Sequence, residues 1–393
     1  MRGKKETVSA ERKLPSLGHA VVRTQYGVSV PLSNEGTVRC LRMTDLINGR
    51  ISLKESKWVS LQERNYRDYL VKSGDILFNR TNSLEQVGKV ALARSDMNAV
   101  FASYLVRIVP NSDIVQPAFL LHLLTSTGWQ SQIRALATKG VSQCNVNVQR
   151  LLRRKVFFPI IARQFRISTL LDSLDDVIEN TRDLVNQTER LKSALAQDLL
   201  VHAMREKRSP VHPAKLGQLF SERTERGRPG LPTISVTMND GIMDREDMDR
   251  RIDSALTPEE HLLAKTGDLA YNMMRMWQGV SGLVPQDSLV SPAYVVVTPG
   301  PNIDAGFAAH FFKLPETIRL FRRYSQGLTD DRLRLYFDQF AEIPVTIPKK
   351  ISDQKRIARL LDTMDEAVAK HESTLAALIR AKTAISNEIF EHP

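Results

Sequence analysis

The sequence predicts an α+β protein with two mixed α/β domains and two long coiled-coil helices, related by a pseudo-two-fold internal repeat. Two observations predict this class. A leucine- and aspartate-rich segment recurs 190 residues further along the chain, and each copy opens a long stretch of apolar residues in heptad spacing. Strand-like and helix-like patterns both precede each copy. The 393 residues are also too many for one ordinary domain.

The repeat keeps its order and spacing. Gln164-Phe-Arg-Ile-Ser-Thr-Leu-Leu-Asp matches Gln354-Lys-Arg-Ile-Ala-Arg-Leu-Leu-Asp at an offset of 190 residues. Upstream, Gly74-Asp-Ile-Leu-Phe-Asn matches Gly267-Asp-Leu-Ala-Tyr-Asn at an offset of 193 residues. Because chance similarity would not keep order and register together, the repeat indicates a duplication.

Each copy of the repeat continues as a long helix. The first helix places these apolar residues at positions a and d: Ile167, Leu170, Leu174, Val177, Leu184, Leu191 and Leu195, with Leu171, Ile178 and Val185 at position e. The second has Ile357, Leu360, Met364, Leu378 and Ile385 in the matching frame, with Leu361, Val368 and Leu375 at e. A helix of roughly 40 residues is about 60 Å long. Since a small domain cannot cover that length, we expect each helix to pack on the other; the alternative is that each packs on its own domain.

The chain therefore divides into four segments: a first domain over 1–160, a central helix over 161–206, a second domain over 207–350 and a C-terminal helix over 351–393. An apolar strand that closes on proline ends each domain. Strands are expected at 27–31, 38–41, 87–92, 104–109, 156–159, 232–236, 294–298 and 343–348, and helices at 116–124 and 318–326.

The charge is uneven along the chain. The net charge is +11, and residues 1–160 hold 24 Lys/Arg against 11 Asp/Glu, whereas residues 207–350 are nearly neutral. A basic domain fits nucleic acid, an anionic membrane surface or acidic proteins, and a solvated surface is the plain alternative. No apolar run reaches eighteen residues, and the basic start is not followed by an apolar stretch, so a cytoplasmic protein is expected.

Motifs for covalent chemistry are absent from the sequence. It has no phosphate-binding Gly-x-x-x-x-Gly-Lys loop, no dinucleotide glycine motif, no metal-spaced histidines and no Asn/Asp-Pro-Pro-Tyr/Phe loop of a DNA adenine methyltransferase. Cys40 and Cys144 lie too far apart in the sequence for a zinc motif. We expect a non-catalytic chain that holds no cofactor and no metal.

The order of these features resembles the specificity (S) subunit of type I restriction-modification systems. Further segments carry the resemblance: Gln25-Tyr-Gly, Leu41-Arg-Met, Gly49-Arg-Ile, Val87-Gly-Lys, Met276-Trp-Gln-Gly and Ser291-Pro-Ala-Tyr. It departs from the family at Arg163 and Asp353, where glutamate usually precedes the glutamine that opens each helix. Met273 stands in the second half where Arg80 stands in the first.

The resemblance implies a DNA-binding function. Each globular segment would be a target recognition domain that reads one half of a bipartite DNA site, at opposite ends of an antiparallel helix pair. The helices would set the gap and dock two modification (methyltransferase) subunits, which bind S-adenosylmethionine. Restriction (helicase-nuclease) subunits that use ATP and Mg would join them to cleave double-stranded DNA.

Candidate DNA contacts follow from residue type and position. A polar run after an apolar strand supplies side chains suited to base edges and phosphates, and basic residues suit phosphates. In the first domain the candidates are Arg23, Gln25, Tyr26, Arg42, Asn79, Arg80, Thr81, Asn82, Ser83, Lys89 and Lys139. In the second they are Asn272, Arg275, Trp277, Gln278, Arg322, Arg323 and Arg332. The alternatives are backbone-binding loops for the polar run, packing for Trp277 and an ordinary exposed helix for the arginines.

Two other functions stay open from the sequence. One is a coiled-coil scaffold that binds protein partners without reading DNA. The other is an enzyme whose motifs are not recognised. Salt-dependent, sequence-selective DNA binding by the assembled complex separates the first from a DNA reader, and methyl transfer or cleavage by the chain alone would support the second.

Overall fold

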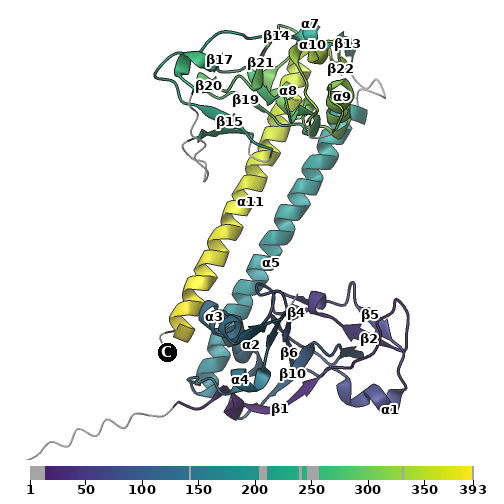
Figure 1. The fold of residues 1–393 in the computed structure, drawn as a ribbon, viewed down its shortest axis with the longest axis vertical. Coiled ribbons are helices and arrows are strands. Elements are labelled where there is room, and N and C mark those ends of the chain that lie inside the picture. The colour runs from purple at the N-terminus through teal and green to yellow at the C-terminus, as the bar shows by residue number, and fades with distance from the viewer. Residues whose placement is uncertain are drawn as a thin grey trace, which may run out of the picture. The chain divides into compact units, whose positions relative to one another are not determined.

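The computed structural model describes residues 14–140, 143–202, 210–238, 241–245, 256–329 and 332–391 (Figure 1). The chain forms two compact units, of which unit 1 comprises residues 1–182 and 373–393 and unit 2 comprises residues 183–372. Each unit therefore holds one mixed domain together with part of each long helix. The expected boundary between 206 and 207 lies outside the described residues.

The two long helices are α5 (Ile161–Gln197), which continues as a π-helical turn over Asp198–His202, and α11 (Ile351–Glu391). They run antiparallel. In unit 1 Lys382 of α11 pairs with Asp175 of α5, whereas in unit 2 Lys192 of α5 pairs with Asp365 of α11. Residue numbers thus rise along one helix as they fall along the other, which confirms the expected helix pair.

The buried face of α5 differs from the expected one. Leu170, Val177, Leu184 and Leu191, assigned to the a and d seam, are 43–60% exposed. Leu171, Ile178 and Val185, assigned to the flanking e position, are at most 8% exposed. Because one residue step turns a helix by about 100°, the domain and the partner helix together cover the side centred on e. The four apolar side chains Leu170, Val177, Leu184 and Leu191, spaced seven residues apart, are left exposed on the neighbouring side.

Unit 1 is built around a four-stranded antiparallel sheet in the order β1-β10-β6-β8, with smaller sheets β5-β2-β9 and β11-β12-β7 and the hairpin β3-β4. The strands are β1 (Val21–Tyr26), β2 (Val38–Leu41), β3 (Leu46–Ile47), β4 (Arg50–Ile51), β5 (Lys57–Val59), β6 (Ile76–Asn79), β7 (Thr81–Asn82), β8 (Val90–Leu92), β9 (Ala99–Phe101), β10 (Leu105–Pro110), β11 (Ala137–Lys139) and β12 (Cys144–Val146). The helices are η1 (Leu17–Ala20), η2 (Met43–Asp45), α1 (Glu63–Tyr66), η3 (Arg67–Tyr69), α2 (Pro117–Thr125), α3 (Thr127–Ala135) and α4 (Val148–Leu152).

Unit 2 repeats this plan. Its four-stranded sheet has the order β14-β21-β18-β19, beside the pairs β13-β22, β15-β16 and β17-β20. The strands are β13 (Val211–Lys215), β14 (Phe220–Glu222), β15 (Ile234–Val236), β16 (Ile242–Asp244), β17 (Leu262–Ala264), β18 (Leu269–Asn272), β19 (Ser281–Leu283), β20 (Ser288–Val290), β21 (Tyr294–Pro299) and β22 (Pro344–Pro348). The helices are α7 (Leu216–Leu219), η6 (Pro258–Glu260), η7 (Met276–Gln278), α8 (Ala305–Phe311), α9 (Pro315–Tyr324) and α10 (Phe337–Ala341).

Most of the expected elements are present, and two are wrong. The strands expected at 38–41, 104–109, 294–298 and 343–348 and both expected helices match observed elements within a few residues. The strand expected at 27–31 is absent because β1 ends at Tyr26, and within 27–31 Val28 forms an isolated bridge with Ala102. The strand expected at 156–159 is also absent, and only the preceding residue, Lys155, joins a β-bridge, with Ser16. The two prolines of β22 lie at its ends, where a missing N–H costs least.

The glutamine that opens each repeat joins the long helix to its own domain. Gln164 is fully buried; its Oε1 accepts from the Gln116 backbone N–H (2.9 Å), and its Nε2 donates to the carbonyls of Ile114 (2.9 Å) and Pro159 (2.7 Å). Gln354, its partner in the repeat, is equally buried and makes the same three bonds in unit 2. Its Oε1 accepts from the Asp304 backbone N–H, and its Nε2 donates to the carbonyls of Asn302 and Pro348. The sequence repeat therefore preserves a side-chain clamp at the start of each helix.

A buried arginine–aspartate pair also recurs, but the arginine has moved. In unit 1 Arg107 on β10 is 1% exposed and donates to Asp75 (2.9 Å) and to Gln25 on β1. In unit 2 the equivalent aspartate, Asp268, is held by Arg223, which follows β14. The strand pairing makes Arg223 the counterpart of Gln25, and a valine takes the place of Arg107. The same buried ion pair is thus supplied from the neighbouring strand.

None of the described helices combines the length and the apolar character needed to cross a bilayer.

Candidate nucleic-acid interface

In unit 1 the small sheet β11-β12-β7 gathers part of the predicted polar run. Thr81 and Asn82 form β7 and pair with Asn145 and Cys144 of β12, and Lys139 ends β11 on the other side of β12. The Thr81 hydroxyl donates to the Asn145 Oδ1 atom (2.5 Å). Residues 64 positions apart in the sequence therefore share one edge, and strand pairing fixes their backbones.

Several side chains predicted as DNA contacts in unit 1 are instead buried or hydrogen-bonded within the domain. Asn79 is 0% exposed, so its side chain cannot reach a base edge. Gln25 accepts a hydrogen bond from buried Arg107. Arg42 donates to the Asp45 carboxylate (3.2 Å) and to the Glu55 carbonyl (2.6 Å). The side chains of Asn79, Gln25 and Arg42 thus support the loops rather than present free donors.

Other predicted residues of unit 1 face solvent. Tyr26 is 51% exposed, and the Arg80 guanidinium carbon lies 5.0 Å from the centroid of its ring. Residues Arg23, Ser83, Lys89 and Lys139 are exposed. Unlike the side chain of Asn79, these exposed side chains are therefore accessible to a ligand outside the domain.

In unit 2 the predicted cluster gathers where α9 packs on η7. Asn272 ends β18, and its Oδ1 accepts from the Met274 backbone N–H (3.0 Å). The Trp277 indole N–H donates to the Met274 carbonyl (3.0 Å), and the Arg322 guanidinium carbon lies 5.5 Å from the indole centroid. Packing therefore fixes the Trp277 ring, while Arg322 lies over its face.

The remaining candidates of unit 2 lie near this cluster in the sequence. Arg275 is exposed and Gln278 half-buried, both at the turn that contains η7. Arg322 and Arg323 occupy the last turn of α9, where cations are favoured by the helix dipole. Arg332 is exposed in the turn after α9. Lys313, which was not predicted as a contact, donates from its ammonium to the Gly279 carbonyl (2.9 Å), and burial, followed by nearby Lys192, lowers its pKa.

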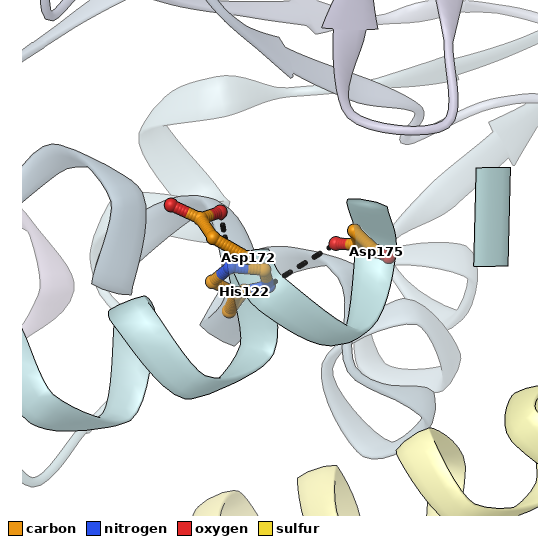
Figure 2. A group of neighbouring side chains, drawn as sticks. All are labelled: His122, Asp172 and Asp175. Atoms are coloured by element: carbon orange, nitrogen blue, oxygen red, sulfur yellow. Dashed lines mark hydrogen bonds and ion pairs between the residues drawn. The ribbon is translucent and has the colours of Figure 1, made fainter. Parts of the chain in front are cut away.

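A cluster of titratable side chains lies where α2 meets α5 (Figure 2). The His122 Nε2 atom lies 2.9 Å from Asp172, and its Nδ1 atom lies 3.9 Å from Asp175. The three could hold a metal ion by geometry. However, Arg94 donates to both Asp172 oxygens and Lys382 pairs with Asp175. Because cations already neutralise both carboxylates, the donor set does not fit a divalent ion.

Hydrogen bonding controls the charge of Asp172. Burial acts to raise its pKa, but hydrogen bonds from His122 and Arg94 outweigh burial and hold the pKa well below the ordinary value for aspartate. The carboxylate is therefore ionised at neutral pH and serves as an anchor between α2 and α5.

The same cluster recurs in unit 2, and the candidate-site reasoning missed both copies. His310 lies 2.8 Å from Asp362 and 3.9 Å from Asp365, and Lys192 pairs with Asp365. The signal was present in the repeat, which keeps Asp172/Asp362, Asp175/Asp365 and Lys192/Lys382 at one offset. Surface aspartates need not survive a duplication, so their retention indicated a buried partner.

Comparison with known proteins gives this architecture a class. Residues 17–190 match the family model of the type I restriction modification DNA specificity domain. This match covers less than half of the chain, which is therefore similar to the type I restriction-modification specificity subunits over that part. It is 25% identical over 191 residues to the EcoBI specificity subunit of Escherichia coli, covering 47% of this chain and 40% of that protein. It is 26% identical over 176 residues to the MjaVIII specificity subunit of Methanocaldococcus jannaschii, covering 44% and 41%. Each match thus spans about two fifths of the relative's length.

Solved structures share the fold over nearly the whole chain. The type I restriction-modification S subunit from M. genitalium superposes with a TM-score of 0.62 at 15% identity, over 98% of both chains. A chain from a study of complex assembly and conformational transition of the type I R-M system gives a TM-score of 0.53 at 16% identity, over 96% of this chain and 98% of that one. Unit 2, of which the family model matches only residues 183–190, therefore shares this fold as well.

Proposed function

We propose that the chain is the sequence-specific DNA-binding subunit of a type I restriction-modification complex. The match of residues 17–190 to a DNA specificity domain carries this proposal. The repeated sheet of unit 2 supports a second recognition domain built on the same plan. Each domain then reads one half of a bipartite site. The two recognition domains are residues 1–160 and 207–350, and the two long helices are residues 161–206 and 351–393.

The two domains present different side chains at equivalent places. The residue after the asparagine that ends the equivalent strand, β6 or β18, is Arg80 in unit 1 and Met273 in unit 2. The net charge also differs between the two domain segments, with the excess in residues 1–160. Two unlike reading surfaces on one scaffold suit an asymmetric DNA site.

The exposed apolar row on α5 supports partner docking. Leu170, Val177, Leu184 and Leu191 recur every seven residues, and the described residues leave them 43–60% exposed. Apolar rows with this spacing pack against another helix. We assign this face to two modification subunits, which would bind S-adenosylmethionine and methylate DNA. Restriction subunits that use ATP and Mg would join them, and the chain itself would catalyse nothing.

Salt dependence tests the DNA reading. The assembled complex should bind duplexes that contain its site far more tightly at 50 mM than at 200 mM salt, because each phosphate contact releases counterions. Duplexes with a scrambled site should bind more weakly at both concentrations. Affinity that is independent of salt and sequence would instead favour a scaffold that does not read DNA.

A further inference from the structure

Arg80 stands on a rigid piece of backbone. It lies between β6 and β7, its backbone N–H donates to the Tyr104 carbonyl (3.1 Å), and its carbonyl accepts from the Val146 N–H (2.9 Å). These bonds join the end of β10 on one side to β12 on the other. The base of the side chain is therefore fixed, although the residue lies on a connection between strands.

The ring beneath the Arg80 guanidinium is fixed as well. Tyr26 is the last residue of β1, and the next residue, Gly27, donates to the Leu105 carbonyl (3.3 Å). A Cβ atom at Gly27 would lie 2.1 Å from the Phe101 carbonyl oxygen, so only glycine fits there. With both backbones held, the guanidinium lies over the Tyr26 ring, 5.0 Å from its centroid.

The hydrogen-bonding capacity of Arg80 is unused by the described residues. Its Nε atom is buried without a partner, and no acceptor among the described residues takes its remaining donors. Three other arginines of unit 1, Arg42, Arg94 and Arg107, each pair with an aspartate. A half-buried guanidinium without an acceptor is unfavourable, so an external acceptor would compensate it.

We propose that Arg80, stacked on Tyr26, reads a guanine in the half-site of unit 1, an inference that rests on the proposed DNA-reading function. The contact with the Tyr26 ring holds the guanidinium in place, and its planar fork matches the O6 and N7 acceptors of guanine in the major groove. Phosphate contacts fall to flexible exposed cations, such as Lys89 on the same connection. Arg80 therefore specifies a base rather than adding only charge.

Unit 2 supplies a variant that the fold tolerates. Strand pairing places Met273 at the position equivalent to Arg80. Arg80→Met therefore removes the guanidinium and keeps a side chain that this fold already carries there. Arg80→Lys keeps the charge without the fork, and Lys89→Ala removes a neighbouring charge without touching the stack.

The test uses the chain assembled with the modification subunits of its own system. Each complex selects duplexes from a randomised pool, and sequencing of the bound fraction gives the base preference at each position. For Arg80→Met and Arg80→Lys we expect the preference for one G·C pair in one half-site to fall by about 5- to 150-fold. The other half-site should be unchanged. For Lys89→Ala we expect weaker binding to all sequences, with the same preferences and a salt slope lower by about one.

The outcomes separate this inference from the proposed function. A wild-type complex without sequence preference would contradict the proposed function. A wild-type preference that Arg80→Met leaves unchanged would contradict the guanine assignment alone. If Arg80→Lys preserves the preference and Arg80→Met lowers affinity uniformly, Arg80 contacts phosphate and the assignment is wrong. Equal thermal midpoints of the wild-type complex and the three variant complexes confirm that folding does not account for the change.

Discussion

Replacing the buried glutamine that opens each long helix should loosen the unit that contains it. Gln164→Leu keeps the side-chain size but removes one acceptor and two donors. Three backbone groups then lose their partners: the Gln116 N–H and the carbonyls of Ile114 and Pro159. Gln354→Leu does the same in unit 2.

The expected loss follows from the number of bonds. A buried polar group left without a partner costs about 1–3 kcal/mol, and three such groups give at least about 3 kcal/mol. The buried leucine offsets part of this through its apolar surface, by about 1 kcal/mol. We therefore expect each substitution to lower the free energy of unfolding of its own unit by at least about 2 kcal/mol. Because the two sites make the same bonds, the two losses should agree within about 1 kcal/mol.

Urea unfolding, with hydrogen exchange read peptide by peptide, measures both the size and the place of the loss. The urea midpoint of the affected unit should fall by about 1 M. Exchange should accelerate around α2 for Gln164→Leu and around α8 for Gln354→Leu. Gln187→Leu is the matched control, because Gln187 lies exposed on α5. A loss below about 0.5 kcal/mol for both buried glutamines would refute the clamp.

Three further predictions concern the folded state. Folding lowers the pKa of Asp172, so the stabilising effect of its carboxylate is present above about pH 4, the ordinary aspartate pKa, and declines as pH falls below it. The difference in urea midpoint between wild type and Asp172→Asn should therefore shrink from pH 5 to pH 3. A constant difference would contradict the ionic anchor. Cys40 and Cys144 are both buried, and burial raises the pKa of Cys40 to about 12. Neither thiol should therefore react quickly with a disulfide reagent at pH 8 until urea is added. Fast labelling of the folded chain would argue against this packing. Gly279 has φ +80°, and a Cβ atom added to it would lie 2.7 Å from Ile318, so Gly279→Ala should destabilise unit 2 by about 1–3 kcal/mol. Gly230→Ala, at a positive-φ position with open space around it, should destabilise unit 2 less. Equal shifts of the thermal midpoint would show that the close contact is unimportant.

The sequence predicted the elements that depend on pattern. The duplication, the two long helices and the strand over 343–348 follow from periodicity and from the missing N–H of proline, whereas the matching strand over 156–159 was wrong. The face of α5 that is buried could not be read in the same way. Leu170 and Leu171 are both large and apolar, and only the placement of the domain beside the helix decides that Leu171 is covered.

The candidate site shows a sharper limit. Asn79 and Arg80 are adjacent and both suit base contacts, but Asn79 points into the core at the end of β6 while Arg80 lies over Tyr26. Alternation along a strand could have separated them if the end of the strand had been known. The role of Gln25 depends on Arg107, 82 residues away, and a single sequence gives no sign of that contact.

The relocated arginine limits how such a protein can be reshuffled. The buried aspartate is satisfied from β10 by Arg107 in unit 1 and from the end of β14 by Arg223 in unit 2. A crossover inside a domain that joined the Gln25 strand to the valine-bearing strand would leave the carboxylate with no cation, and the reciprocal product would bury two arginines against one acid. Viable recombinants between the halves should therefore exchange the sheet as a block, with breakpoints outside it, so that each aspartate is inherited together with its own arginine.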